Sequence, residues 1–128
     1  MGVALPIENA FIKYWVEEDI LFGEYKHVDV NSLAIAMECV KDRLLLANGN
    51  SYPYLLDARK LRSINKEARD YFASEESEKC MVAGAILVDS SITTIIGNFF
   101  LKINKPSIPT RIFTDKEKAL DWLRKFLN

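Results

Sequence analysis

The 128-residue chain is poor in the residues from which catalytic and metal sites are usually built. It has one histidine, His27, and two cysteines, Cys39 and Cys80, neither of which belongs to a Cys-x-x-Cys motif. A structural zinc site needs four such ligands, so we predict no metal site. The sequence also shows neither a glycine-rich phosphate loop nor a matched pair of catalytic groups. We therefore predict no catalytic residues and no cofactor, and a protein that is not an enzyme.

The chain also lacks a charge excess and a long apolar run. Its net charge is −1, which predicts no binding to the phosphate backbone of a nucleic acid. No apolar run approaches the roughly 18 residues of a membrane span, which predicts no integral membrane association. The first six residues have neither the basic region nor the apolar core of a signal peptide. We expect a cytoplasmic protein whose cysteines are reduced and packed.

What the sequence does contain is ordinary for a globular domain. Hydrophobic residues make up 49% of the chain and charged residues 27%, and these values argue against disorder. A chain of this length can bury one core of two or three layers, but not two separate cores. We therefore predict a single domain over residues 1–128.

The first half of the chain predicts a β-hairpin followed by a helix. Residues 11–16 and 20–27 are rich in β-branched and aromatic side chains, and an acidic turn separates them. The helix begins at Asn31 or Ser32 and ends at 48–50, where Asn and Gly tolerate the left-handed conformation. The apolar stripe predicted for its buried face consists of Leu33, Met37, Val40, Leu44 and Ala47.

The second half alternates strands and helices. A strand over 54–57 precedes a helix that begins near Asn65. Residues 81–88 carry no charge, which is typical of a central strand covered on both faces. A short last strand covers 110–113. The residues of the helix after Asn65 that we expect to face inward are Ala68, Tyr71 and Phe72.

Two further helices complete the pattern. One runs to residue 103 from a cap at Ser90 or Ser91, and the other follows a capping box formed by Thr114 and Glu117. The apolar side of the last helix consists of Ala119, Leu120, Leu123, Phe126 and Leu127. The order ββαβαβαβα predicts an α/β fold with a mixed sheet, in which an N-terminal β-hairpin precedes parallel strands joined by crossover helices.

Two segments carry a resemblance to a known family. The first is Tyr54-Leu55-Leu56-Asp57 with its loop and helix, and the second is 109–115 followed by Ala119-Leu120-Asp121-Trp122-Leu123. Together with the opening hairpin, they make nearly the whole chain resemble the small STAS-like domains of the anti-anti-sigma factor (SpoIIAA-like) group, including stand-alone relatives of unknown function. The resemblance implies a SpoIIAA-like fold and a non-enzymatic regulatory or protein-interaction module, with another regulatory protein as a partner.

The resemblance also bears on regulation by phosphorylation. Sigma-regulating members of the family carry a phosphorylatable Ser or Thr at the start of the helix after this strand. The corresponding positions here read Ile64-Asn65-Lys66-Glu67 and contain no hydroxyl, while Ser63 lies earlier in the loop. We therefore predict a module that is not switched by phosphorylation at the position that the family uses.

The loop and helix start after residue 57 gather basic residues where a parallel sheet places its ligands. One interpretation is an edge that binds an anion or a protein partner, because a helix N-terminus and guanidinium groups both attract negative charge. The other is a solvated surface with local ion pairs, in which Asp57 and Arg59 form a structural pair. The candidate residues are Asp57, Arg59, Arg62, Ser63, Asn65, Lys66 and Arg69.

The helix over 91–103 has more large apolar residues than one buried face requires. It is either fully buried in the core or offers a second apolar face to a partner or a ligand. We expect a homodimer through this face, and as an alternative function a protein that binds a small anion or an acyl-like, lipid-like ligand between this helix and the sheet. The candidate interface residues are Ile92, Ile96, Phe99, Phe100 and Ile103.

Overall fold

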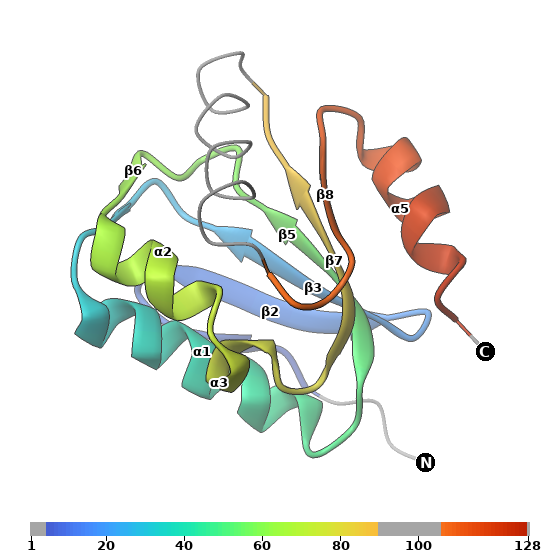
Figure 1. Ribbon diagram of the computed structural model, residues 1–128, viewed down its shortest axis with the longest axis horizontal. Helices are drawn as coiled ribbons and strands as arrows, with labels where there is room; N and C mark the ends of the chain where they lie inside the picture. The colour runs from blue at the N-terminus through green and yellow to red at the C-terminus, as the bar shows by residue number, and fades with distance from the viewer. Residues whose placement is uncertain (1–4, 90–105, 128) are drawn as a thin grey trace.

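The computed structural model describes residues 5–89 and 106–127 of the chain. Its main feature is a six-stranded mixed sheet with helices on both faces (Figure 1). In spatial order the strands are β1 (Ile7–Glu8), β2 (Ile12–Glu17), β3 (Ile20–Tyr25), β5 (Tyr52–Asp57), β7 (Met81–Leu87) and β8 (Thr110–Phe113). One face is covered by α1 (Leu33–Ala47), α2 (Lys66–Phe72) and α3 (Glu75–Glu78), and the other by α5 (Lys116–Arg124). The predicted α/β class is confirmed.

The sheet combines an antiparallel hairpin with a parallel half, as predicted. Strands β2 and β3 pair in an antiparallel register that sets Trp15 opposite Phe22. Their turn holds Glu18 and Asp19 at φ angles of 52° and 64°, which matches the right-handed twist of a two-residue hairpin. Strands β3, β5, β7 and β8 then pair in parallel. The carboxyl end of β5 therefore leads directly to the loop that precedes α2.

The ends of α1 agree with the sequence, but its buried face agrees only in part. The Ser32 side chain accepts a hydrogen bond from the Ile35 backbone and caps the helix, and Asn48 ends it in the left-handed conformation. Leu33 and Met37, however, are exposed. Val40 and Ala47 of the predicted stripe are buried, and Leu44 is half-buried. The other buried residues of the helix are Ala36, Cys39, Arg43 and Leu46.

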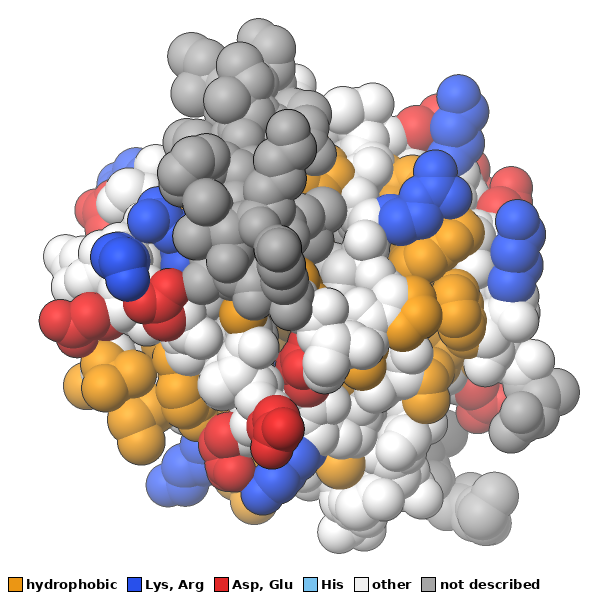
Figure 2. Space-filling view, in the orientation of Figure 1, with side chains coloured by type: hydrophobic (Ala, Val, Ile, Leu, Met, Phe, Trp, Pro, Cys, Tyr) orange, Lys and Arg blue, Asp and Glu red, His pale blue; other side chains and the backbone are white. Residues whose placement is uncertain are grey.

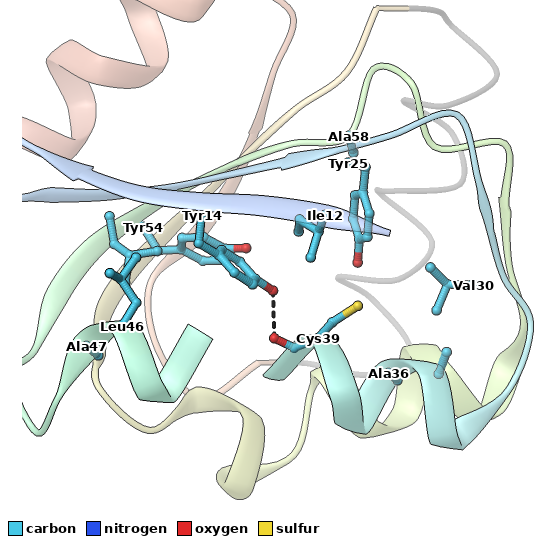
Figure 3. Packing of buried hydrophobic residues seen from close by; sticks show 12 residues of the cluster. Ile12, Tyr14, Tyr25, Val30, Ala36, Cys39, Leu46, Ala47, Tyr54 and Ala58 are labelled. Carbon is cyan, nitrogen blue, oxygen red and sulfur yellow. Dashed lines mark hydrogen bonds between the residues drawn. The ribbon is translucent and has the colours of Figure 1, made fainter. Parts of the chain in front are cut away.

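The reason for this rotation of α1 lies on the sheet. Tyr14 and Tyr25 project from the strands toward the helix and belong to the same buried cluster as Ala36 and Cys39 (Figure 3). Small residues such as Ala36 and Cys39 let the helix approach these rings, whereas leucine and methionine at the same places would overfill the layer. The size of the facing residues, and not the hydrophobicity of the helix, decides which side is buried.

The second half of the fold is close to the prediction, with two corrections. Strand β7 is an interior strand, but it lies beside the edge strand β8 and not in the middle of the sheet. Asn65 caps α2 by accepting a hydrogen bond from Ala68 N, as expected. The predicted cap at Thr114 is wrong: α5 begins one residue later, and Asp115 accepts from Lys118 N at 3.2 Å. The apolar side predicted for this helix packs against the sheet.

Four short elements were not predicted, because none is long enough to show a periodic pattern. They are β1, α3, and a separate two-stranded parallel sheet of β4 (Asp29–Val30) and β6 (Ser63–Ile64). The helix predicted over 91–103, with its caps at Ser90 or Ser91, lies outside the described residues, and so do its candidate interface residues Ile92, Ile96, Phe99, Phe100 and Ile103. Within the ranges that are described, no helix has the length and apolar character needed to cross a membrane.

The first prediction compares the two adjacent candidates for the cap of α5. Asp115→Ala should lower the free energy of unfolding by about 1 kcal/mol, because the Lys118 backbone donor loses its acceptor. Thr114→Ala is the matched control and should stay within about 0.5 kcal/mol of the parent, as an exposed position outside the helix. Urea unfolding measures both. An equal or larger loss at Thr114 would place the cap there after all.

The second prediction concerns two strand glycines with different surroundings. A Cβ at Gly23 would lie 2.5 Å from Tyr54 Oη and 2.9 Å from Tyr14 Cε1, both on buried rings. Gly23→Ala should therefore cost about 1–3 kcal/mol through overpacking. At Gly84 the nearest atom, Met81 Cε, is 3.5 Å away, so Gly84→Ala should be neutral or stabilising by up to about 1 kcal/mol.

Thermal or urea unfolding of the two alanine variants gives the comparison directly. The expected order of stability is Gly84→Ala at or above the parent, with Gly23→Ala clearly below it. A Gly23→Ala variant as stable as the parent would show that the tyrosine rings can move aside, and that they do not fix the spacing between α1 and the sheet.

Candidate functional site

The predicted basic edge begins with an ion pair between Asp57, the last residue of β5, and Arg59. The guanidinium of Arg59 donates from Nε to Asp57 Oδ1 at 2.9 Å and from Nη2 to Oδ2 at 2.6 Å. The backbone N–H of Arg59 also donates to Oδ1, at 3.1 Å. Burial alone would raise the pKa of Asp57, but these bonds from Arg59 outweigh it and the pKa is lowered. Asp57 and Arg59 therefore form the structural pair that the sequence suggested.

The other polar groups of the edge also meet partners close to them. Arg62 lies 3.4 Å from Asp29, whose carboxylate also accepts a hydrogen bond from the Ser63 hydroxyl at 2.7 Å. Lys66 pairs with Asp70 at 2.8 Å, one turn further along α2. These contacts agree with the interpretation as a solvated, locally paired surface. Anion or partner binding at this edge stays a prediction.

Arg69 differs from the rest of the predicted edge because it lines a cavity. This cavity has a volume of about 160 Å³ and lies between the sheet and the helices α1, α2 and α3. Its walls come from helices and strands that are far apart in the sequence, and they are mostly apolar, with Leu56, Ile86 and Phe72 among them. The polar groups of the wall are few: Arg69, Arg43, Glu78, Ser77, Thr110 and three tyrosines.

The three tyrosines, Tyr14, Tyr25 and Tyr54, are buried side chains on the sheet side of the cavity. The Tyr14 hydroxyl donates to the backbone oxygen of Cys39 in α1 at 2.9 Å, drawn as the dashed line in Figure 3. Burial is the main cause that raises the pKa of all three hydroxyls. The tyrosines are therefore neutral near neutral pH and can take part in hydrogen bonds without giving up a proton.

Arg43 brings a full positive charge into the same wall, although its exposed fraction is 2%. Its Nη1 donates to the carbonyl of Lys79 at 3.2 Å, and Nη2 donates to the carbonyl of Ser77. The guanidinium carbon lies 5.3 Å from the centre of the Tyr54 ring, in a cation–π arrangement. None of the ion pairs found among the described residues involves Arg43. Its charge thus meets carbonyl dipoles and an aromatic face.

Glu78 is the acidic residue among those that line the cavity, and its carboxylate already has hydrogen-bond partners. Its carboxylate accepts hydrogen bonds from Ser107 N at 3.0 Å and from the Ser107 hydroxyl. The half-buried Arg69, which also lines the cavity, takes part in none of the ion pairs within the described part of the chain. Two guanidinium groups against one bonded carboxylate leave the polar part of the wall with positive character.

Cys39, His27 and the acidic residues show no arrangement typical of a nucleophile or a metal site among the described residues. Burial raises the pKa of the Cys39 thiol to about 12, so little of the reactive thiolate forms at neutral pH. His27 is exposed on the loop after β3. In the residues that the structure describes, His, Cys, Asp and Glu side chains form no group of three or more that could hold a metal ion.

Sequence reasoning found Arg69 but missed the rest of the cavity wall. Arg43 could have been noticed, because it continues the line of small residues formed by Ala36 and Cys39 at helical spacing. A charged residue in such a line is unusual enough to suggest a buried role. The tyrosines on three different strands show no common signal, since their meeting depends on strand order.

Comparisons with known proteins bear on the fold. The family model described as "Domain of unknown function (DUF7793)" matches residues 14–127. An uncharacterized protein of the DUF3478 family from Shewanella loihica PV-4, described as having a SpoIIAA-like fold, is similar in structure, with a TM-score of 0.58 and 19% identity. The similarity covers 91% of this chain and 98% of the other, and it confirms the predicted STAS-like, SpoIIAA-like resemblance at the level of the fold. No curated protein matches the chain. The chain belongs to the DUF7793 family.

Proposed function

We propose that this protein is a non-enzymatic regulatory module that acts by binding a small, largely apolar molecule in the cavity beneath α1, α2 and α3. The observation that carries the proposal is the cavity itself, about 160 Å³ of space walled mostly by apolar side chains. Ligand sites typically combine such walls with a few placed polar groups. For scale, an engineered apolar cavity of about 150 Å³ binds benzene.

The groups around the cavity favour recognition over catalysis. The three tyrosine hydroxyls have raised pKa values, and so does the Cys39 thiol, which makes all four poor proton donors or nucleophiles near neutral pH. The SpoIIAA-like fold supports a regulatory role by analogy. We place this module in the cytoplasm.

The start of α2 supports a module that phosphorylation does not switch at the usual position. Asn65 is engaged as the helix cap, Lys66 pairs with Asp70, and the Ser63 hydroxyl is bonded to Asp29. These three polar groups already have structural partners. We therefore infer that ligand binding in the cavity, and not phosphorylation at the start of α2, regulates the protein.

A second candidate function is protein–protein interaction, with a second copy of the chain as the partner. Figure 2 shows hydrophobic side chains gathered at the lower left, over α1. The exposed fractions are 48% for Met37 and 60% for Leu45, and both residues line a shallow groove with Tyr71. A symmetric contact between two such helix faces would remove them from water. The dimer residues predicted over 91–103 and a second regulatory protein as partner stay predictions.

For the ligand-binding function we predict that toluene stabilises the protein. When toluene exceeds its Kd about tenfold, the midpoint of thermal unfolding should rise by about 4 °C, because a ligand of the native state alone shifts the unfolding equilibrium. Gly84→Leu fills the cavity from its wall and should abolish the rise. Val82→Leu, at an exposed position of the same strand, is the matched control and should keep it.

Two results would contradict the function. The first is a parent whose unfolding midpoint does not change up to the solubility limit of toluene. The second is an unchanged toluene effect in Gly84→Leu, which would place the binding elsewhere. Native mass spectrometry of protein purified from its own host is the complementary measurement, and a small molecule that stays bound is the expected result.

For the interaction function, the parent should sediment as a dimer at high micromolar concentration, and Leu45→Glu should be a folded monomer. A charge in the centre of an apolar contact is not tolerated, whereas an exposed side chain on a monomer accepts it. Leu5→Glu, at another exposed leucine, is the control and should stay dimeric. A parent that is monomeric at that concentration removes α1 as an interface between copies.

A further inference from the structure

We propose that the ligand of the cavity is a small carboxylic acid with an apolar body, and that the buried Arg43 guanidinium receives its carboxylate. This inference rests on the proposed ligand-binding function and goes beyond it by assigning the chemical class. The apolar walls accept the body of the molecule, and the two guanidinium groups of the wall give its polar end a destination.

Arg43 carries a buried positive charge that no ion pair among the described residues compensates. A guanidinium has five N–H donors, and the bonds to Ser77 and Lys79 account for two of them among the described residues. Both acceptors are neutral carbonyls. A buried charge without a counter-charge is costly, and removing that cost is what an anionic ligand would do.

The chemistry of the cavity wall favours a carboxylate on an apolar body over inorganic phosphate. Guanidinium and carboxylate groups match in shape and form two parallel charge-assisted hydrogen bonds. Inorganic phosphate is strongly hydrated and gains nothing from apolar side chains such as Leu56 and Ile86. Apolar side chains make up most of the cavity surface. A carboxylate attached to a ring or a branched chain uses both parts of the site.

Glu78, the acidic residue of the cavity wall, does not neutralise Arg43 because its carboxylate already accepts hydrogen bonds from Ser107. The carboxylate of Glu78 is bonded to Ser107, and no ion pair connects it to Arg43 in the part of the chain that the structure describes. Arg69, on the α2 side of the cavity, adds a second positive charge. The volume of about 160 Å³ limits the body to about one ring, which makes benzoate a suitable probe.

The experiment compares benzoate with its neutral isostere benzamide and with inorganic phosphate, by isothermal titration on the full chain at neutral pH. Benzoate should bind at least about tenfold more tightly than benzamide, since a hydrogen bond to a charged group contributes about 1.5–3 kcal/mol. Phosphate should not bind detectably. Amide chemical-shift changes on benzoate addition should centre on α1 and on the residues that line the cavity.

Variants then assign the preference to Arg43. Arg43→Gln should lower benzoate affinity at least about tenfold and leave benzamide affinity within about twofold, since charge and not shape has changed. Arg43→Lys should recover part of the preference. Arg124→Gln removes an exposed arginine of α5, on the opposite face of the sheet, and should bind both probes as the parent does.

Each remaining outcome has a defined meaning. Equal binding of benzoate and benzamide overturns the assignment of a carboxylate while the proposed ligand-binding function stands. Failure of benzoate, benzamide and toluene to bind overturns both. If Arg43→Gln does not fold, the ratio measured on the parent and on Arg43→Lys decides the question, because a folded lysine variant with the full preference of the parent would show that the guanidinium does not receive the carboxylate.

Discussion

The contacts of the buried Arg43 guanidinium are the interactions on which the face of the sheet covered by α1, α2 and α3 depends. It extends from α1 to the carbonyls of Ser77 and Lys79, at the end of α3 and just beyond it. A four-residue helix has no stability of its own, so its place must come from contacts such as these. The guanidinium also lies over the Tyr54 ring. One side chain thus joins the long helix, the short helix and the sheet, and closes part of the cavity wall.

The cavity exists because large and small residues are distributed unevenly over this face of the sheet. Near β2 and β3, tyrosine rings fill the layer, and α1 meets them with Ala36 and Cys39. Gly23 gives the rings of Tyr14 and Tyr54 the room that a Cβ would occupy. Toward β7 and β8 the strands offer smaller side chains, and the described helices do not fill the space above them. The remaining volume follows from this mismatch in side-chain size.

Features of the fold that depend on neighbouring residues could be predicted from the sequence, whereas features that depend on residues far apart in the chain could not. The hairpin and the caps at Ser32 and Asn65 depend on neighbouring residues, so they could be read directly. Thr114 and Asp115 are adjacent and both residue types are favoured at helix N-caps, so only the helix geometry separates them. The buried face of α1 depends on residues of the sheet, and hydrophobicity alone wrongly placed Leu33 and Met37 on it. The cavity combines residues from many elements, so the strand-end rule of open sheets found Arg69 and missed Arg43.

Helix α2 links the predicted edge to the cavity. Its N-terminal end is occupied by local partners, with Asn65 as the cap and Lys66 paired with Asp70. Its inner side contributes Arg69 and Phe72 to the cavity wall. Under the proposed function, a ligand would therefore contact the helix whose N-terminal end forms part of the predicted edge. A seven-residue helix has little stability apart from its packing, so filling or emptying the space beneath it changes the free energy with which it is held.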